Sequence, residues 1–147
     1  MLNQFQNNEV SDWITANLSL SREITTPFDA ILKKIMREKK MTKNQLSDIA
    51  NISIRSIERY LMVRHDDFDD FMPSMKNIVA ISVVCNLDIL MVESLLDSLY
   101  VKFNKRKKRD RIYCWIIENH SGKSIPECNK IMRDLGLEYK HLLTEIR

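Results

Sequence analysis

The chain has 147 residues, a formal net charge of +3, two glycines and three prolines. Strand-rich folds need many tight turns, and tight turns usually need glycine, so we expect an all-α fold. The length suits one substantial core, or a domain with a small appendage. No apolar stretch approaches the roughly 20 residues that span a bilayer, and the N-terminus lacks the pattern of a signal peptide. We therefore expect a cytoplasmic protein with no membrane partner.

The first strong helical pattern follows a polar N-terminal extension, residues 1–26. Thr26 is a candidate N-cap, and Pro27 suits the first position of a helix. Apolar residues then recur at i, i+3, i+4, i+7 and i+8, the spacing of one helix face: Phe28, Ile31, Leu32, Ile35 and Met36. This pattern predicts a helix from residue 27 to about Lys40.

Two short helices are predicted within residues 42–61. Thr42 and Gln45 form a T-x-x-Q capping box, which begins the first of them. Asn51 tolerates the left-handed conformation that ends a helix, and Ser53 can cap the next helix. The predicted buried residues of the pair are Leu46, Ile49, Ala50, Ile57, Tyr60 and Leu61. Helices joined by so few residues must cross steeply, as in a helix-turn-helix.

An acidic loop separates this pair from two further helices. Four aspartates face a single arginine there: Asp66, Asp67, Asp69, Asp70 and Arg64. The loop lacks the oxygen-ligand spacing and the glycine of a calcium site, so no metal is expected. Pro73 and Ser74 begin a fourth helix that ends at Asn86, and Asp88 caps a fifth helix. We expect the apolar stripe of the fifth helix to continue to Phe103.

The last part of the chain, residues 104–147, is predicted to be a small helical unit. It opens with a basic run: Lys105, Arg106, Lys107, Lys108 and Arg109. A solvated hinge or helix end is the plainer interpretation of this run, and non-specific phosphate contact is the alternative. Asp110 would cap a helix through Trp115, and a further helix would follow with Leu135 on its core face. The Trp115 helix is apolar on more than one face, which makes this unit the candidate dimerisation element.

Nothing in the sequence predicts an enzyme or a cofactor. The chain has no H-E-x-x-H, Gly-rich phosphate loop, paired C-x-x-C or nucleophile elbow. Cys114 and His120 would lie roughly 240° apart around one helix axis, so they do not form a nucleophile–base pair. The three cysteines are far apart and have apolar neighbours, which is typical of reduced thiols.

The stretch T-K-N-Q-L-S-D-I-A-N-I-S-I-R-S-I-E-R-Y, Thr42 to Tyr60, resembles the Cro/CI-type (Xre-like) helix-turn-helix family of phage and bacterial repressors. With its flanking helices the resemblance covers residues 28–96. It implies a five-helix, lambda-repressor-like DNA-binding domain at residues 27–103. Proteins of this kind commonly dimerise on DNA, so the resemblance implies a homodimeric transcription regulator that reads the major groove of double-stranded DNA with its third helix.

The resemblance also implies site residues. The family's base-reading positions hold Ile54, Arg55 and Arg59. An arginine fork matches the two acceptors of guanine and gives roughly 1–3 kcal/mol of discrimination, and an aliphatic side chain can pack against a thymine methyl. Lys43 falls on a phosphate-contacting position at a helix start. Ser53 and Ser56 can add hydroxyl contacts to DNA.

The acidic loop leaves two functions open. In the family this segment runs beside the DNA backbone and usually carries basic or neutral groups. The first hypothesis is a sequence-specific DNA-binding regulator. The second is a protein-interaction module, such as an antitoxin, anti-repressor or inhibitor, that keeps the fold and binds a basic partner through residues 66–70. For Arg55 and Arg59, the alternative to base reading is a solvated helix surface.

Overall fold

The computed structural model describes residues 26–63 and 72–145 of the chain. Every regular element in these two ranges is a helix: α2 (Phe28–Glu38), α3 (Lys43–Ala50), α4 (Ile54–Tyr60), α5 (Met75–Val84), α6 (Ile89–Ser98), α7 (Lys108–His120), α8 (Ile125–Asp134) and the 3-10 helix η1 (Tyr139–His141). The all-α prediction is therefore confirmed. None of the described helices is long and apolar enough to cross a membrane. The acidic loop, residues 66–70, and the N-terminal extension up to residue 25 lie outside the described residues.

Local capping bonds begin most of these helices where the sequence predicts. Thr42 Oγ1 accepts from the Gln45 N–H at 3.2 Å, and Gln45 Oε1 accepts from the Thr42 N–H at 2.8 Å. This reciprocal pair completes the capping box. Four other N-cap side chains also accept a backbone N–H from three residues further on: Ser53, Ser74, Asp88 and Ser124.

Several predicted helix ends are wrong. Pro27, rather than Thr26, is the N-cap of α2, and it makes no side-chain capping bond. The fifth predicted helix, α6, ends at Ser98 instead of continuing to Phe103, because Tyr100 takes a left-handed φ of 59°. Asp110 is not a cap, since α7 begins two residues earlier, at Lys108.

Two predicted core residues lie at the surface. Ile49 of α3 is 43% exposed and Leu135, just after α8, is 41% exposed. Both fit an apolar helical spacing, but that spacing marks a broad stripe of a helix, and the neighbouring helices cover only part of it. The helices that pack against a short helix therefore decide which part of its apolar face is buried.

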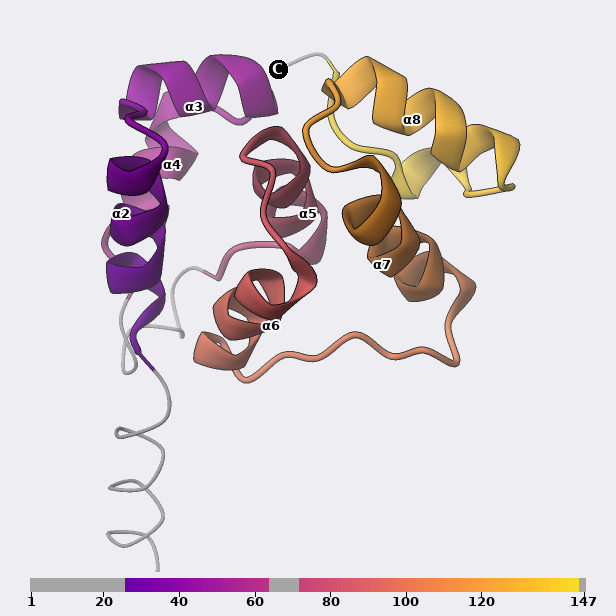
Figure 1. Ribbon diagram of the computed structural model, residues 1–147, viewed down its shortest axis with the longest axis horizontal. Coiled ribbons are helices and arrows are strands. Elements are labelled where there is room, and N and C mark those ends of the chain that lie inside the picture. The colour runs from indigo at the N-terminus through magenta and orange to yellow at the C-terminus, as the bar shows by residue number, and fades with distance from the viewer. Residues whose placement is uncertain (1–25, 64–71, 146–147) are drawn as a thin grey trace, which may run out of the picture.

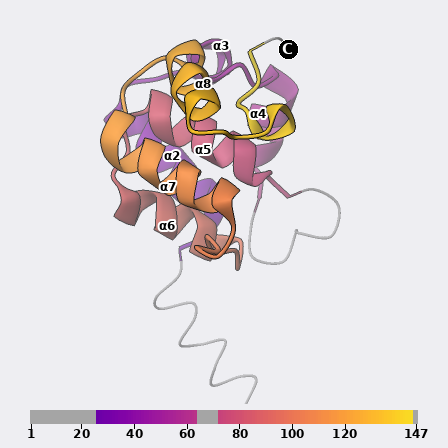
Figure 2. The same cartoon turned by 90° about the vertical axis from the view of Figure 1, so that its right-hand side faces the viewer.

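The helices pack around α5. This helix contacts α3, α6, α7 and α8, and residues 78–83 are buried without interruption, as expected of a helix enclosed on all sides. Figure 1 shows α5 and α6 between α2–α4 and the α7–α8 pair, and Figure 2 shows α7 running across α5 and α6. One hydrophobic cluster includes Leu46 and Ile57 as well as Ile116 and Met132. The C-terminal helices thus share a continuous core with α2–α6.

Candidate nucleic-acid interface

The turn between α3 and α4 is closed by hydrogen bonds from its own residues. Asn51 ends α3 in the left-handed conformation, with φ 53° and ψ 42°, as the sequence predicts. Ser47, which is only 2% exposed, donates its hydroxyl to the Ile52 carbonyl at 2.5 Å. The Ile52 N–H donates back to the Ser47 carbonyl at 3.3 Å. Because both ends of the turn are bonded to each other, α4 leaves α3 in a fixed direction.

Sequence reasoning missed the role of Ser47. A serine within a helix often bonds to a nearby carbonyl, but the usual acceptor lies three or four residues earlier in the chain. Here the acceptor is five residues later, across the turn. A small hydroxyl residue facing a helix-turn-helix turn is the signal that could have predicted it.

The buried side of α4 is anchored to two other helices. Ile57 and Tyr60 are 0% and 2% exposed. The Tyr60 ring meets Phe28 of α2 edge-on, with 6.2 Å between ring centroids, and its hydroxyl accepts from Asn77 Nδ2 of α5 at 2.7 Å. Burial raises the pKa of Tyr60, although the hydrogen bond from Asn77 opposes the shift. These contacts fix the rotation of α4 about its own axis.

The opposite side of α4 carries the predicted base-reading residues. Arg55 and Arg59 are exposed, and Ile54 is half-buried. Residues four apart in a helix lie roughly 40° from each other around its axis, and each arginine lies roughly 160° from Ile57. The two guanidinium groups therefore project from the same side of α4, away from the core.

The residues predicted to contact phosphate differ in whether a hydrogen-bond donor remains for a phosphate oxygen. Lys43 is exposed at the first position of α3. The Ser53 hydroxyl accepts from the Ser56 N–H at 3.1 Å and donates to the Ser56 hydroxyl at 2.9 Å. Since a hydroxyl has a single hydrogen to donate, Ser53 gives its hydrogen to the Ser56 hydroxyl, whereas Ser56 keeps its own for a phosphate oxygen.

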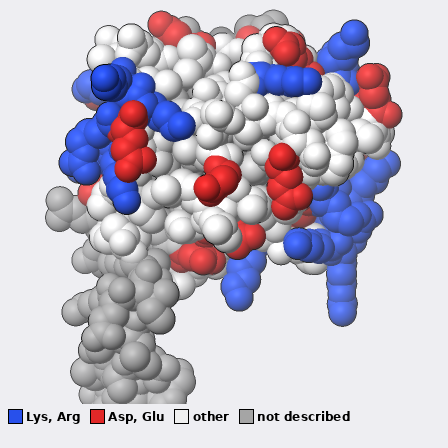
Figure 3. All heavy atoms as spheres, in the orientation of Figure 1, with Lys and Arg blue, Asp and Glu red and all other residues white. Residues whose placement is uncertain are grey.

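Positive charge gathers beside the α3–α4 pair. Residues 27–61 contain eight lysines and arginines against four acidic residues, a net charge of +4. One of those acids, Asp29, is buried and lies 3.4 Å from the Lys33 ammonium. Figure 3 shows basic side chains grouped over α2 and, separately, at the start of α7. The first group adjoins the α3–α4 pair.

The second basic group is the predicted basic run, residues 105–109. It is not brought together with α4, because α5 and α6 lie between them (Figure 1). Lys105, Arg106, Lys107 and Lys108 are exposed. Lys108 and Arg109 belong to the first turn of α7, so these two residues of the run do form a helix end.

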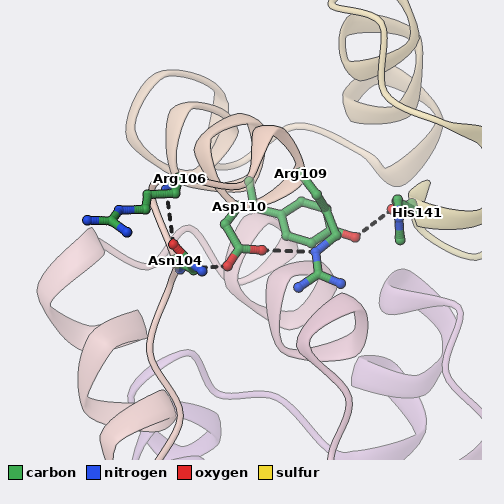
Figure 4. A network of polar contacts seen from close by, with 6 residues as sticks. Asn104, Arg106, Arg109, Asp110 and His141 are labelled. Carbon is green, nitrogen blue, oxygen red and sulfur yellow. Dashed lines mark hydrogen bonds and ion pairs between the residues drawn. The ribbon is translucent and has the colours of Figure 1, made fainter.

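Arg109 has a structural role within this run. Its Nε donates to Asp110 Oδ1 at 2.9 Å, and Asp110 Oδ2 accepts from the Asn104 N–H at 2.6 Å (Figure 4). The guanidinium also lies 6.0 Å from the centre of the Tyr113 ring, within the range of a cation–π contact. Asp110 is only 2% exposed. Arg109 therefore neutralises a buried carboxylate that orders the start of α7.

No protein-family model matches this chain, and neither a curated protein nor a solved structure matches it. Among the described residues, no group of three or more His, Cys, Asp or Glu could hold a metal ion. The candidate site is therefore defined by the α3–α4 geometry and its charges.

Proposed function

We propose that this chain is a sequence-specific regulator of transcription that binds double-stranded DNA and inserts α4 into the major groove. The observation that carries the proposal is the exposure of Arg55 and Arg59 on the side of α4 opposite Ile57. Four residues of helix rise roughly 6 Å, so the two arginines could reach guanines on different base pairs. Ile54, at the start of α4, would contact a thymine methyl.

Phosphate contacts would orient α4 in the groove. Lys43 lies at the start of α3, where the helix dipole also favours an anion. The net positive charge of residues 27–61 supports attraction to a polyanion. In this proposal the charge on α2 and α3 brings the protein to DNA of any sequence, and α4 supplies the discrimination.

We infer that the protein acts as a homodimer, because the seven residues of α4 read few base pairs and paired half-sites lengthen the target. The C-terminal unit is the proposed dimerisation element. Trp115 and Leu135 remain 42% and 41% exposed there, and they line an open cavity of ≈ 360 Å³ together with Ile112, Lys108 and Arg111. An apolar patch with a charged rim is suited to a subunit contact.

Selection of bound sites from random duplex DNA tests the proposal, followed by titration of the selected site. Each of Arg55→Ala and Arg59→Ala should weaken the selected site by about 5- to 150-fold, from roughly 1–3 kcal/mol per base contact, and should relax the preference at one position. Lys43→Ala should weaken all sequences alike and should lower the slope of log K against log salt by about 0.9. Lys130→Ala, on the exposed surface of α8, is the matched control.

Two results would count against sequence-specific DNA binding. One is the absence of any duplex affinity at low salt by a protein with a native circular dichroism spectrum. The other is binding without sequence preference that Arg55→Ala and Arg59→Ala change no more than the control. Either result would leave the protein-interaction hypothesis, which a partner bound through residues 66–70 would support.

A further inference from the structure

A third group of cations, distinct from those over α2 and at the start of α7, surrounds a cavity on the C-terminal unit. The cavity has a volume of ≈ 290 Å³ and lies where the start of α5, α8 and the chain after η1 meet. Lys76, Arg133 and Lys140 line it, together with Tyr139, Thr144 and a single carboxylate, Glu145. We call it the C-terminal cavity. Its three cations come from three separate segments, so the fold, and not a local run of sequence, brings them together.

One wall of the cavity is fixed by a buried side chain. Asn129 of α8 is 1% exposed. Its Nδ2 donates to the Leu143 carbonyl at 2.7 Å and to Glu145 Oε1 at 2.9 Å, and its Oδ1 accepts from the Leu143 N–H at 2.8 Å. Leu142 and Leu143 are themselves buried. The segment that carries Thr144 and Glu145 is therefore held against α8 in one position.

A second contact holds η1 against α7. The Tyr113 hydroxyl donates to the His141 carbonyl at 2.6 Å (Figure 4). Burial raises the pKa of Tyr113 to about 12, so the hydroxyl keeps the proton that it donates. Because the residues directly after Lys140 are anchored in this way, the fold holds its backbone beside the cavity.

The electrostatics of the cavity favour an anion. Burial and then the positive charges of Arg109, Lys140 and Lys76 lower the pKa of the neighbouring His141. Lys140 has a carboxylate 3.5 Å away in Glu138, but both groups are 71% exposed, and such surface pairs contribute little. Lys76 is also the second residue of α5, at the positive end of that helix dipole. Three cations against one carboxylate leave an excess of positive charge.

The start of α5 links the cavity to the proposed DNA-reading helix. Lys76 lines the cavity and is the neighbour of Asn77, whose side chain bonds to Tyr60 at the end of α4. In Figure 1 α4 and η1 lie on opposite flanks of α5, and in Figure 2 both lie on the same side of the molecule. A duplex that lies along α4 and continues past the start of α5 would therefore reach the C-terminal cavity.

We propose that the C-terminal cavity binds a phosphate group, and that this group is a backbone phosphate of the DNA that α4 reads. The second half of the proposal rests on the proposed function. Arg133 and Lys140 would hold the phosphate oxygens, and the Thr144 hydroxyl and Lys76 would complete the contact. The C-terminal unit then extends the DNA footprint without adding sequence preference, because a phosphate carries no base information.

The first arm of the test uses inorganic phosphate, with sodium chloride of equal ionic strength as the reference. Titration followed by NMR should shift the backbone amides of Lys76 and Thr144. The double variant Arg133→Ala/Lys140→Ala should abolish these shifts. Both residues are exposed, so the fold should persist, and an unchanged amide spectrum elsewhere checks it. Lys102→Ala/Lys130→Ala removes two exposed charges elsewhere and should leave the shifts intact.

The second arm uses duplex DNA. Loss of one phosphate contact should lower the slope of log K against log salt by about 0.9, which corresponds to about fivefold weaker binding at 0.15 M salt. Arg133→Ala/Lys140→Ala should show this loss relative to Lys102→Ala/Lys130→Ala, with the selected sequence unchanged. Glu145→Gln should have the opposite effect and tighten binding, because it removes the one carboxylate yet keeps the oxygen that Asn129 Nδ2 contacts.

The outcomes separate this inference from the proposed function. Phosphate binding in the cavity by a protein that binds no DNA would support the anion site, with free phosphate as its source, and would refute the DNA assignment. DNA binding with the same salt slope in both double variants, and no phosphate-induced shifts, would overturn the inference and leave α4 as the reader. Absence of both DNA binding and phosphate-induced shifts would overturn both proposals.

Discussion

The left-handed residue at the turn between α3 and α4 can be tested by a pair of substitutions. Asn51 has φ 53° and ψ 42°, a conformation that costs an ordinary L-residue roughly 1–2 kcal/mol and that asparagine tolerates better. Asn51→Ala should therefore lower the free energy of unfolding by about 1 kcal/mol and the melting temperature by about 4 °C. Asn51→Gly should change stability by less than about 0.5 kcal/mol, because relief of strain offsets the greater freedom of glycine in the unfolded chain.

Urea unfolding followed by circular dichroism at 222 nm measures both variants. Asn86 provides the control site, since it has φ 54° after α5 and is exposed. Asn86→Ala should cost a similar free energy without affecting the turn between α3 and α4. The reasoning fails if Asn51→Ala is as stable as the wild type, or if Asn51→Gly is the less stable of the two. Either result would mean that residue 51 does not carry a left-handed turn.

Two further predictions concern the C-terminal unit and the thiols. Asn129→Ala should destabilise the protein by about 2 kcal/mol, because it leaves the buried N–H and carbonyl of Leu143 without their partner, and faster hydrogen exchange at the Leu143 amide would report the change. Burial raises the pKa of Cys85 and Cys128 to about 11, so at pH 8 a disulfide reagent such as DTNB should modify half-buried Cys114 first. Stability should fall as the pH rises from 9 to 11, because these thiols lose their protons in the unfolded chain before they do so in the folded one. Equal labelling rates for all three thiols in the native protein would contradict this assignment of burial.

The starts of the helices that have a side-chain N-cap were predictable because their causes are local. An N-cap such as Thr42 bonds to a backbone group three residues away, so the residues that make the bond are read directly from the sequence. The ends at Asn51 and Asn86 follow from a property of asparagine itself. The end of α6 was not predictable in this way, because the residue that turns left-handed there is Tyr100, which has no special preference for that conformation.

The exposed arginines of α4 were also predictable, and for a related reason. Once Ile57 and Tyr60 are assigned to the core, the helical repeat places Arg55 and Arg59 on the opposite side. Ile49 shows where a prediction from the helical repeat alone fails, because it is predicted to be buried and is exposed. It shares the apolar spacing of Leu46, but α3 is covered by only a few neighbours, and only the packed structure reveals which edge is left at the surface.

The C-terminal cavity could not have been predicted from the sequence. Its cations, Lys76, Arg133 and Lys140, are separated by long stretches of chain and belong to no motif. They meet because α8 and the segment after η1 fold back onto the start of α5. Such a site depends on long-range packing, which single-sequence patterns do not encode.

Charge density along the sequence is therefore a weak guide to where an anion binds. The densest basic run, residues 105–109, leads into α7. Arg109 within it is bonded to a buried carboxylate. The exposed lysines of the run lie across α5 and α6 from α4. By contrast, the dispersed cations converge on one cavity that has fixed walls and shares the start of α5 with the contacts of α4. A phosphate gains most where several donors are already positioned around it. For this reason we propose the C-terminal cavity, rather than residues 105–109, as the second DNA contact.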